Sequence, residues 1–293
     1  MTRRETKEHR SSECGIRSSE SPHIELHSEF PTPNCVTFFS LTMRYAVLSD
    51  IHANLEALTA VMEALAASRI DRYLCLGDVV GYGADPSTCL SRLQDCEALI
   101  VSGNHDVACI GKLEMGWFND AAKASLLWTR DQLTFTDLDV LRRWPLKADE
   151  GPLTLVHGTL RHPGRFEYLV DVAQAVDTMS ICPTRICLVG HTHLACVIEY
   201  DRTQRRLTRV LTTPQELAEV TFEDHPASRR YVVNPGSVGQ PRDGDPRAGY
   251  AIIDTDRKQI IVHRVPYDVE AAQRKIREAG LPAFLADRLA IGR

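Results

Sequence analysis

The chain has 293 residues, of which 43% are hydrophobic and 25% charged, and this balance excludes a fully disordered chain or a collagen-like repeat. Its formal net charge is −5, and we therefore expect no nucleic-acid partner, because domains that grip nucleic-acid phosphates are usually basic. No run of 18 apolar residues occurs, so the sequence predicts no transmembrane helix.

Residues 1–42 differ from the rest of the chain in composition. They are rich in Ser, Glu and Arg and carry almost no apolar periodicity, which predicts a disordered leader. Met43 directly precedes the first clear strand, and we put forward the hypothesis that the native product begins there. We expect residues 43–293 to form a single domain with a helical insert at about 107–150.

The first part of the domain alternates between strands and helices. The pattern predicts strands over 44–49, 73–76 and 98–101, and helices from Asn54 to about 68 and from Pro86 onward. Strand, helix, strand, helix and strand in this order make two βαβ units, so we expect the three strands to be parallel.

The rest of the domain first becomes helical and then rich in strands. We expect a helix over 119–133 and a shorter one capped by Thr136. Trp117, Phe118 and Trp128 of this insert either cap a site or fill the core. The remaining expected elements are strands at 153–156, 186–189, 196–200, 207–211, 231–233, 250–253 and 260–265, and helices at 172–179, 269–278 and 281–289.

Nine cysteines are present, and none forms a CxxC pair. An odd number without metal-ligand spacing favours reduced structural thiols over disulfides or a zinc site. We therefore expect a cytoplasmic protein.

Polar residues follow five of the predicted strands at the point where each strand ends. In open α/β sheets this carboxyl edge is where ligands bind, so we expect these side chains to meet. They are Asp50 and His52, Asp78, Asn104 with His105 and Asp106, His157, and His191 with His193.

Carboxylates, imidazoles and an amide oxygen suit first-row divalent metals such as Mn, Fe, Ni or Zn. The set is too large for one tetrahedral ion and large enough for two ions that share a carboxylate, the usual apparatus for splitting phosphate esters. Gly77, Gly103 and Gly190 precede three of the motifs and allow backbone to approach the ions closely.

The motifs Asp50-x-His52, Gly77-Asp78, Gly103-Asn-His-Asp106, His157 and Gly190-His-Thr-His193 together resemble the calcineurin-like metallophosphoesterase superfamily. The resemblance spans about residues 44–265 and is greatest to its small bacterial and archaeal phosphodiesterases. It implies a four-layer αββα sandwich with two facing mixed β-sheets.

The resemblance also implies roles for single residues. One metal would take Asp50, His52, Asp78 and His193, and the other Asp78, Asn104, His157 and His191, with Mn favoured. His105 would face the leaving group as a general acid or charge stabiliser, and Asp106 would hold its ring.

Two segments carry candidates for contact with the substrate phosphate. Arg161, His162 and Arg165 follow His157 closely, and Arg242 ends a glycine-rich segment that begins at Asn234. Both segments are also explained as ordinary loops or turns. Protein serine/threonine phosphatases of the superfamily carry a phosphate-gripping Arg where this chain has Tyr82, which disfavours that activity.

The resemblance therefore implies a phosphodiesterase that hydrolyses small soluble phosphate esters by attack of a metal-bridging hydroxide. A phosphomonoesterase acting on nucleotides or phosphoproteins is the alternative enzyme class. A non-catalytic scaffold is the third reading, disfavoured because every ligand and His105 are present. The expected partner is a small phosphate-ester substrate, with homo-oligomers left open.

Overall fold

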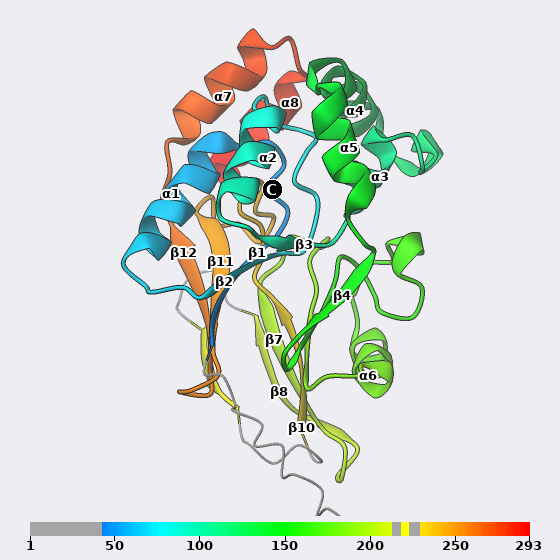
Figure 1. Ribbon diagram of the computed structural model, residues 1–293, viewed down its shortest axis with the longest axis vertical. Coiled ribbons are helices and arrows are strands. Elements are labelled where there is room, and N and C mark those ends of the chain that lie inside the picture. The colour runs from blue at the N-terminus through cyan, green and yellow to red at the C-terminus, as the bar shows by residue number, and fades with distance from the viewer. Residues whose placement is uncertain (1–42, 213–217, 223–228) are drawn as a thin grey trace, which may run out of the picture. The chain divides into compact units, whose positions relative to one another are not determined.

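The computed structural model describes residues 43–212, 218–222 and 229–293. The predicted leader, 1–42, lies outside these residues. In the described part, two six-stranded sheets face each other, and helices cover their outer surfaces (Figure 1). This arrangement confirms the expected four-layer αββα sandwich.

The first sheet is built around the strand that begins the domain. The three strands of the βαβ units are parallel, as predicted, and the other three strands are added antiparallel. The strand order is β3 (Leu99–Ile100), β2 (Arg72–Cys75), β1 (Arg44–Leu48), β11 (Ala248–Asp254), β12 (Gln259–Val265) and β9 (Ala218–Thr221).

The second sheet is also mixed. Its three central strands, β5, β6 and β10, are parallel, and the remaining strands pair antiparallel with their neighbours. The strand order is β4 (Lys147–Glu150), β5 (Leu153–Val156), β6 (Ile186–Leu188), β10 (Arg229–Asn234), β7 (Cys196–Asp201) and β8 (Arg206–Thr212).

Alternating side chains of β1 belong to two different cores. Tyr45 and Val47 pack between the sheets with Leu155 and Leu188 of the second sheet. Ala46 and Leu48 point to the opposite face and pack with the helices that cover the first sheet. Successive side chains of a strand point to opposite faces, and both faces of β1 are buried. The sequence of β1 is therefore a continuous apolar run.

The outer helices are α1 (Leu55–Ala66) and α2 (Pro86–Asp95) over the first sheet and α6 (Val172–Ile181) over the second. The side chain of Asn54 accepts a hydrogen bond from Ala57 N at 3.1 Å, which confirms the predicted cap of α1.

The insert contains α3 (Asn104–Cys109), the short 3₁₀ helix η1 (Met115–Trp117), α4 (Asp120–Gln132) and α5 (Phe135–Arg143). The cap predicted at Thr136 is wrong. Helix α5 begins two residues earlier, because Thr134 and Asp137 cap each other's backbone amides reciprocally.

The chain ends in helices that pack against α1 and the insert, where they share a hydrophobic cluster with Ala122 and Trp128. These helices are α7 (Val269–Glu278), α8 (Ala283–Asp287) and η3 (Arg288–Ile291), and a further 3₁₀ turn, η2 (Pro163–Arg165), follows β5.

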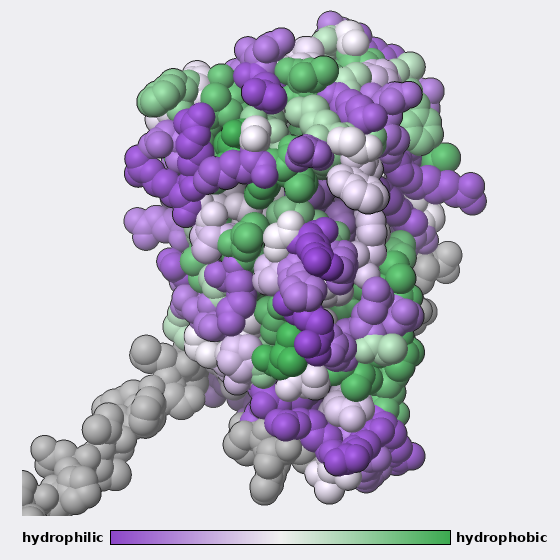
Figure 2. Space-filling view, turned by 90° about the vertical axis from the view of Figure 1, so that its right-hand side faces the viewer, coloured by the Kyte–Doolittle hydropathy of each residue, from purple (hydrophilic) through white to green (hydrophobic). Residues whose placement is uncertain are grey.

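On the face that Figure 2 presents, hydrophilic side chains predominate and hydrophobic ones are scattered among them. Among the described residues, no helix is both long and apolar enough to pass through a membrane.

Candidate metal centre

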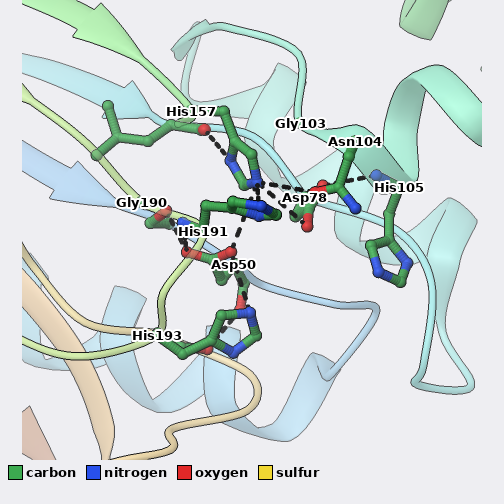
Figure 3. Close-up of polar contacts among 12 residues, drawn as sticks. Asp50, Asp78, Gly103, Asn104, His105, His157, Gly190, His191 and His193 are labelled. Carbon is green, nitrogen blue, oxygen red and sulfur yellow. Dashed lines mark hydrogen bonds and ion pairs between the residues drawn. The ribbon is translucent and has the colours of Figure 1, made fainter. Parts of the chain in front are cut away.

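Loops from both sheets bring the predicted ligand residues to one place (Figure 3). Each loop leaves the carboxyl end of a parallel strand, as expected. The Asp and His side chains are almost completely buried, and the most exposed of them, His191, is only 5% exposed. The contributors are β1 for Asp50 and His52, β2 for Asp78, β3 for Asn104, β5 for His157 and β6 for His191 and His193.

The backbone of these loops is unusual. Five ligand residues lie in the left-handed region, although none is glycine: Asp50, His52, Asp78, His191 and His193, with φ between 49° and 66°. Each such residue costs about 1–3 kcal/mol and persists only where the surrounding structure holds its backbone in place. The β1 and β2 loops hold each other in this conformation, because Asp50 N donates to Gly77 O at 3.0 Å and His52 N donates to Asp78 O at 2.9 Å.

Three imidazoles are oriented in the same way. Nδ1 of His52, His157 and His193 lies beside a backbone carbonyl oxygen, which can only accept a hydrogen bond. Nδ1 therefore carries a hydrogen in each ring, and whenever the ring is neutral the lone pair of Nε2 faces the centre. The acceptors are, in that order, the carbonyl oxygens of Val80 at 3.2 Å, Leu76 at 2.7 Å and Gln240 at 2.6 Å.

A first group of acceptors converges without a donor among them. Nε2 of His52 and Nε2 of His193 are 3.2 Å apart. Oδ1 of Asp50 is 3.3 Å from His193 Nε2 and 3.9 Å from His52 Nε2, and this buried oxygen accepts no hydrogen bond. Lone pairs and a carboxylate that face one another at these distances fit a cation bound between them.

A second group surrounds His157. Its Nε2 is 3.3 Å from Asp78 Oδ2, 3.2 Å from Asn104 Oδ1 and 3.1 Å from His191 Nδ1. Oxygen and imidazole nitrogen again converge on one point, which is the donor chemistry of a first-row divalent metal.

Asp78 lies between the two groups. Its Oδ2 is 3.3 Å from His157 Nε2 and 3.7 Å from His52 Nε2, and its Oδ1 accepts a hydrogen bond from His105 N at 2.8 Å. The seven predicted ligands thus fit two cations that share one carboxylate.

The buried carboxylates and imidazoles of the cluster shift one another's pKa values. Burial opposes ionisation of Asp50 and Asp78, but neighbouring imidazoles, His193 for Asp50 and His157 for Asp78, hold the pKa of both carboxyls well below its usual range. Although burial acts in the other direction, Asp78 raises the pKa of His157 to about 9. At neutral pH His157 therefore holds a proton that a metal would displace.

Comparison with known proteins agrees with this geometry. A family model described as a calcineurin-like phosphoesterase superfamily domain matches residues 43–258, which is most of the chain. The chain belongs to the calcineurin-like phosphoesterase superfamily.

Similar proteins and structures match this chain over nearly their whole length. An uncharacterized protein of Methanocaldococcus jannaschii is 36% identical over 257 residues, which cover 85% of this chain and 98% of that protein. The crystal structure of a metallophosphoesterase from Sphaerobacter thermophilus is 39% identical, has a TM-score of 0.74, and is matched over 86% of this chain and 100% of its own. A hypothetical protein of Pyrococcus horikoshii, 22% identical with a TM-score of 0.63, shares the fold over 85% of this chain and 98% of its own.

The glycines of the phosphoesterase motifs give the ligands room. A Cβ on Gly190 would lie 2.9 Å from Asp50 Oδ2 and 2.1 Å from Ser49 Oγ. A Cβ on Gly103 would lie 2.1 Å from Asp78 Oδ1 and 2.4 Å from Asp78 N. The expected close approach of backbone to the centre is therefore present.

Gly103→Ala is expected to push Asp78 out of position and to lower both bound metal and stability, the latter by about 1–3 kcal/mol, as for other overpacked sites. Gly116→Ala is the matched control, because a Cβ there meets no atom within 4 Å. Metal analysis and thermal melting of both variants measure the effect. Equal metal content in the two variants would contradict the assigned contact.

His105 lies beside the centre, and its ring meets Phe118 edge-on with the centroids 5.1 Å apart. Its Nδ1 is buried and has no hydrogen-bond partner. Burial lowers the pKa of His105 to about 4 in the metal-free protein, so the ring would act as an acid only after the negative charge of a bound substrate raises that pKa.

The expectation that Asp106 holds the His105 ring differs from the observed contacts. The two Asp106 carboxylate oxygens instead accept hydrogen bonds from backbone amides of the β2 loop and of the turn before α3. The donors are Asp78 N at 2.8 Å, Val79 N at 3.0 Å, Val80 N at 3.2 Å and Gly103 N at 2.9 Å. Asp106 thus fixes the backbone that carries Asp78.

A pocket opens from the centre. Arg242 lines it as predicted, with Nη2 donating to Gln240 Oε1 at 2.7 Å and its guanidinium 5.8 Å from the Tyr82 ring centroid. The sequence offered no sign of Tyr168, which stacks on His191 with ring centroids 3.8 Å apart.

Arg161 does not line this pocket, contrary to expectation. Its guanidinium is exposed and binds both carboxylate oxygens of Asp177 on α6. Arg165, the other arginine expected from this segment, does line the pocket. The difference arises because the chain turns through η2 between the two arginines.

Proposed function

We propose that this phosphoesterase hydrolyses small soluble phosphodiesters with the aid of two divalent metal ions. The observation that carries the proposal is the pair of converging acceptor groups that share Asp78. Such paired sites bind and activate phosphate esters in other proteins. The complete ligand set argues against a non-catalytic scaffold.

We assign Asp50, His52, Asp78 and His193 to one ion and Asp78, Asn104, His157 and His191 to the other. When bound, the ions would lower the pKa of a water molecule and offset charge on the phosphoryl oxygens. We propose Mn before Fe, Ni or Zn on the strength of the two carboxylates and the amide oxygen, while the four imidazoles suit Fe, Ni or Zn.

The chain's own groups complete the reaction. Arg242 is a guanidinium at the pocket wall that would bind a phosphoryl oxygen, and Gln240 and Tyr82 hold it in place. His105 would donate a hydrogen bond, and finally a proton, to the departing oxygen as negative charge develops there.

Two flanks of the pocket favour a diester over a monoester. Phe118 packs against His105 on one flank, and Tyr168 stacks on His191 on the other. A diester has two organic groups, and each flank offers one of them an apolar surface.

Paired assays with bis(p-nitrophenyl) phosphate and p-nitrophenyl phosphate test this proposal. Metal-stripped protein is reloaded with Mn, Fe, Ni or Zn, and the rate with each ester is measured. We expect metal-dependent hydrolysis with a higher kcat/KM for the diester. A higher value for the monoester would identify a phosphomonoesterase, and no hydrolysis of either would favour a scaffold.

We also propose that the protein works in the cytoplasm as an enzyme of small molecules. Seven cysteines in the described ranges are free thiols, as a reducing compartment would maintain them. Cys14 and Cys35 lie outside those ranges.

A further inference from the structure

The pocket next to the metal centre has an apolar side that the proposed hydrolysis does not itself require. One end of the pocket holds the ligand residues and Arg242, which bind phosphate under the proposed function. The insert supplies the side nearest His105 through Leu113, Trp117 and Phe118. A ligand that fills the pocket therefore has a phosphate at one end and an apolar part at the other.

Trp117 is the most exposed large hydrophobic residue in the described part of the chain, at 93%. It ends η1, whose turn closes with a hydrogen bond from Phe118 N to Met115 O at 3.0 Å. Among the described residues, its ring stacks on no other aromatic ring and belongs to no hydrophobic cluster. A large indole that is left open beside a polar site provides a surface for a ligand.

The position of Phe118 indicates which part of the substrate reaches this surface. The Phe118 ring contacts His105, and His105 is the group assigned to the leaving oxygen. Trp117 and Phe118 therefore lie on the side of the centre where the leaving alcohol departs. Tyr168 lines the same pocket but stacks on His191, a member of the ligand group around His157.

Hydrogen-bonding groups border the same surface. Oδ1 of Asn119 accepts from Ala122 N at 2.9 Å to cap α4, which leaves the amide NH₂ of Asn119 to donate. Arg165 also lines the pocket with an exposed guanidinium. Donors beside an indole suit a flat ring whose edge carries hydrogen-bond acceptors, rather than an alkyl chain.

We propose that Trp117 and Phe118 form a subsite for a planar heteroaromatic ring carried by the leaving alcohol. The substrate is then a phosphodiester of a nucleoside-type alcohol, whose base stacks on Trp117 while its phosphate lies at the metal centre and Arg242. This inference rests on the proposed function, because that function determines which side of the centre the leaving group occupies.

The test compares two ligands that differ only in the ring. Adenosine 5′-phosphate and ribose 5-phosphate share the phosphate and the sugar, and calorimetry measures their affinities for Mn-loaded protein. We expect adenosine 5′-phosphate to bind roughly 5- to 150-fold more tightly, the range for one stacked base. Trp117→Ala should remove most of this ratio.

Phe135→Ala is the matched control, because Phe135 is also exposed, at 78%, but does not line the pocket. It should keep the wild-type ratio. A wild-type ratio near one, or an unchanged ratio in Trp117→Ala, would overturn the subsite. If the ratio behaves as expected but neither nitrophenyl ester is hydrolysed, the proposed function fails while the ring subsite stands.

Discussion

Asp78→Asn is expected to remove most of the bound metal and most of the hydrolytic activity. One carboxylate serves both acceptor groups, with Oδ2 3.3 Å from His157 Nε2 and 3.7 Å from His52 Nε2. An amide carries no charge and offers one ligating oxygen instead of two, so the binding of both ions is weakened at once. Substitution of a residue that only hydrogen-bonds to a metal ligand lowers metal affinity or activity by about 10- to 100-fold. We expect substitution of a ligand shared by both ions to lower them by more than about 100-fold.

Loss of the fold would not account for this result. The amide oxygen keeps the ability to accept the hydrogen bond from His105 N that Asp78 Oδ1 accepts at 2.8 Å. Circular dichroism should therefore show an unchanged fold. Asp95→Asn, an exposed residue at the end of α2, is the control and should keep metal and activity. Two ions per chain with full activity in Asp78→Asn would contradict the shared role.

Much of the first sheet is predictable from the sequence, because its signals are local. The apolar runs of β1 and β2 are bounded by helices with recognisable beginnings, Asn54 and Pro86, and their length matches βαβ units. The ligand residues then follow from one rule, that the carboxyl ends of parallel strands meet at one edge.

Other elements leave no such local signal. Strand β4, Lys-Ala-Asp-Glu, is polar and half-exposed because it is an edge strand, so its pattern does not resemble a buried strand. Strand β9 is an edge strand of the other sheet. The insertion of β10 between β6 and β7 is a long-range pairing that no local window contains.

At the site, too, some features follow from the local sequence and others depend on the three-dimensional structure. His105 and Asp106 adjoin in sequence, which suggested a direct contact, yet the helical backbone of α3 turns the carboxylate toward four amides. Arg161 follows His157 closely in sequence but leaves the pocket to pair with Asp177. Sequence proximity therefore predicted which segments meet and not which side chains touch.

His105→Ala is expected to lower turnover by roughly 100- to 10,000-fold while both ions stay bound, which is the usual contribution of a positioned proton donor. In-line displacement places negative charge on the departing oxygen, and we propose that the His105 ring, which contacts Phe118, lies on that side of the centre. The loss should be larger for an alkoxide leaving group than for nitrophenolate, since nitrophenolate departs readily without a proton. Steady-state kinetics with both kinds of diester, together with metal analysis, provide the measurement.

The His105→Ala result also decides whether His105 is a ligand. His105 lies close enough to Asp78 and His52 for the three side chains to contact a common ion. If the variant loses metal while its turnover per remaining metal pair stays the same, His105 is a ligand and not a proton donor. His162→Ala, an exposed imidazole on the loop after β5, is the control and should change neither quantity. A selective loss of rate that grows with the basicity of the leaving group, with both ions still bound, is the pattern expected when His105 acts on the leaving oxygen and not as a ligand.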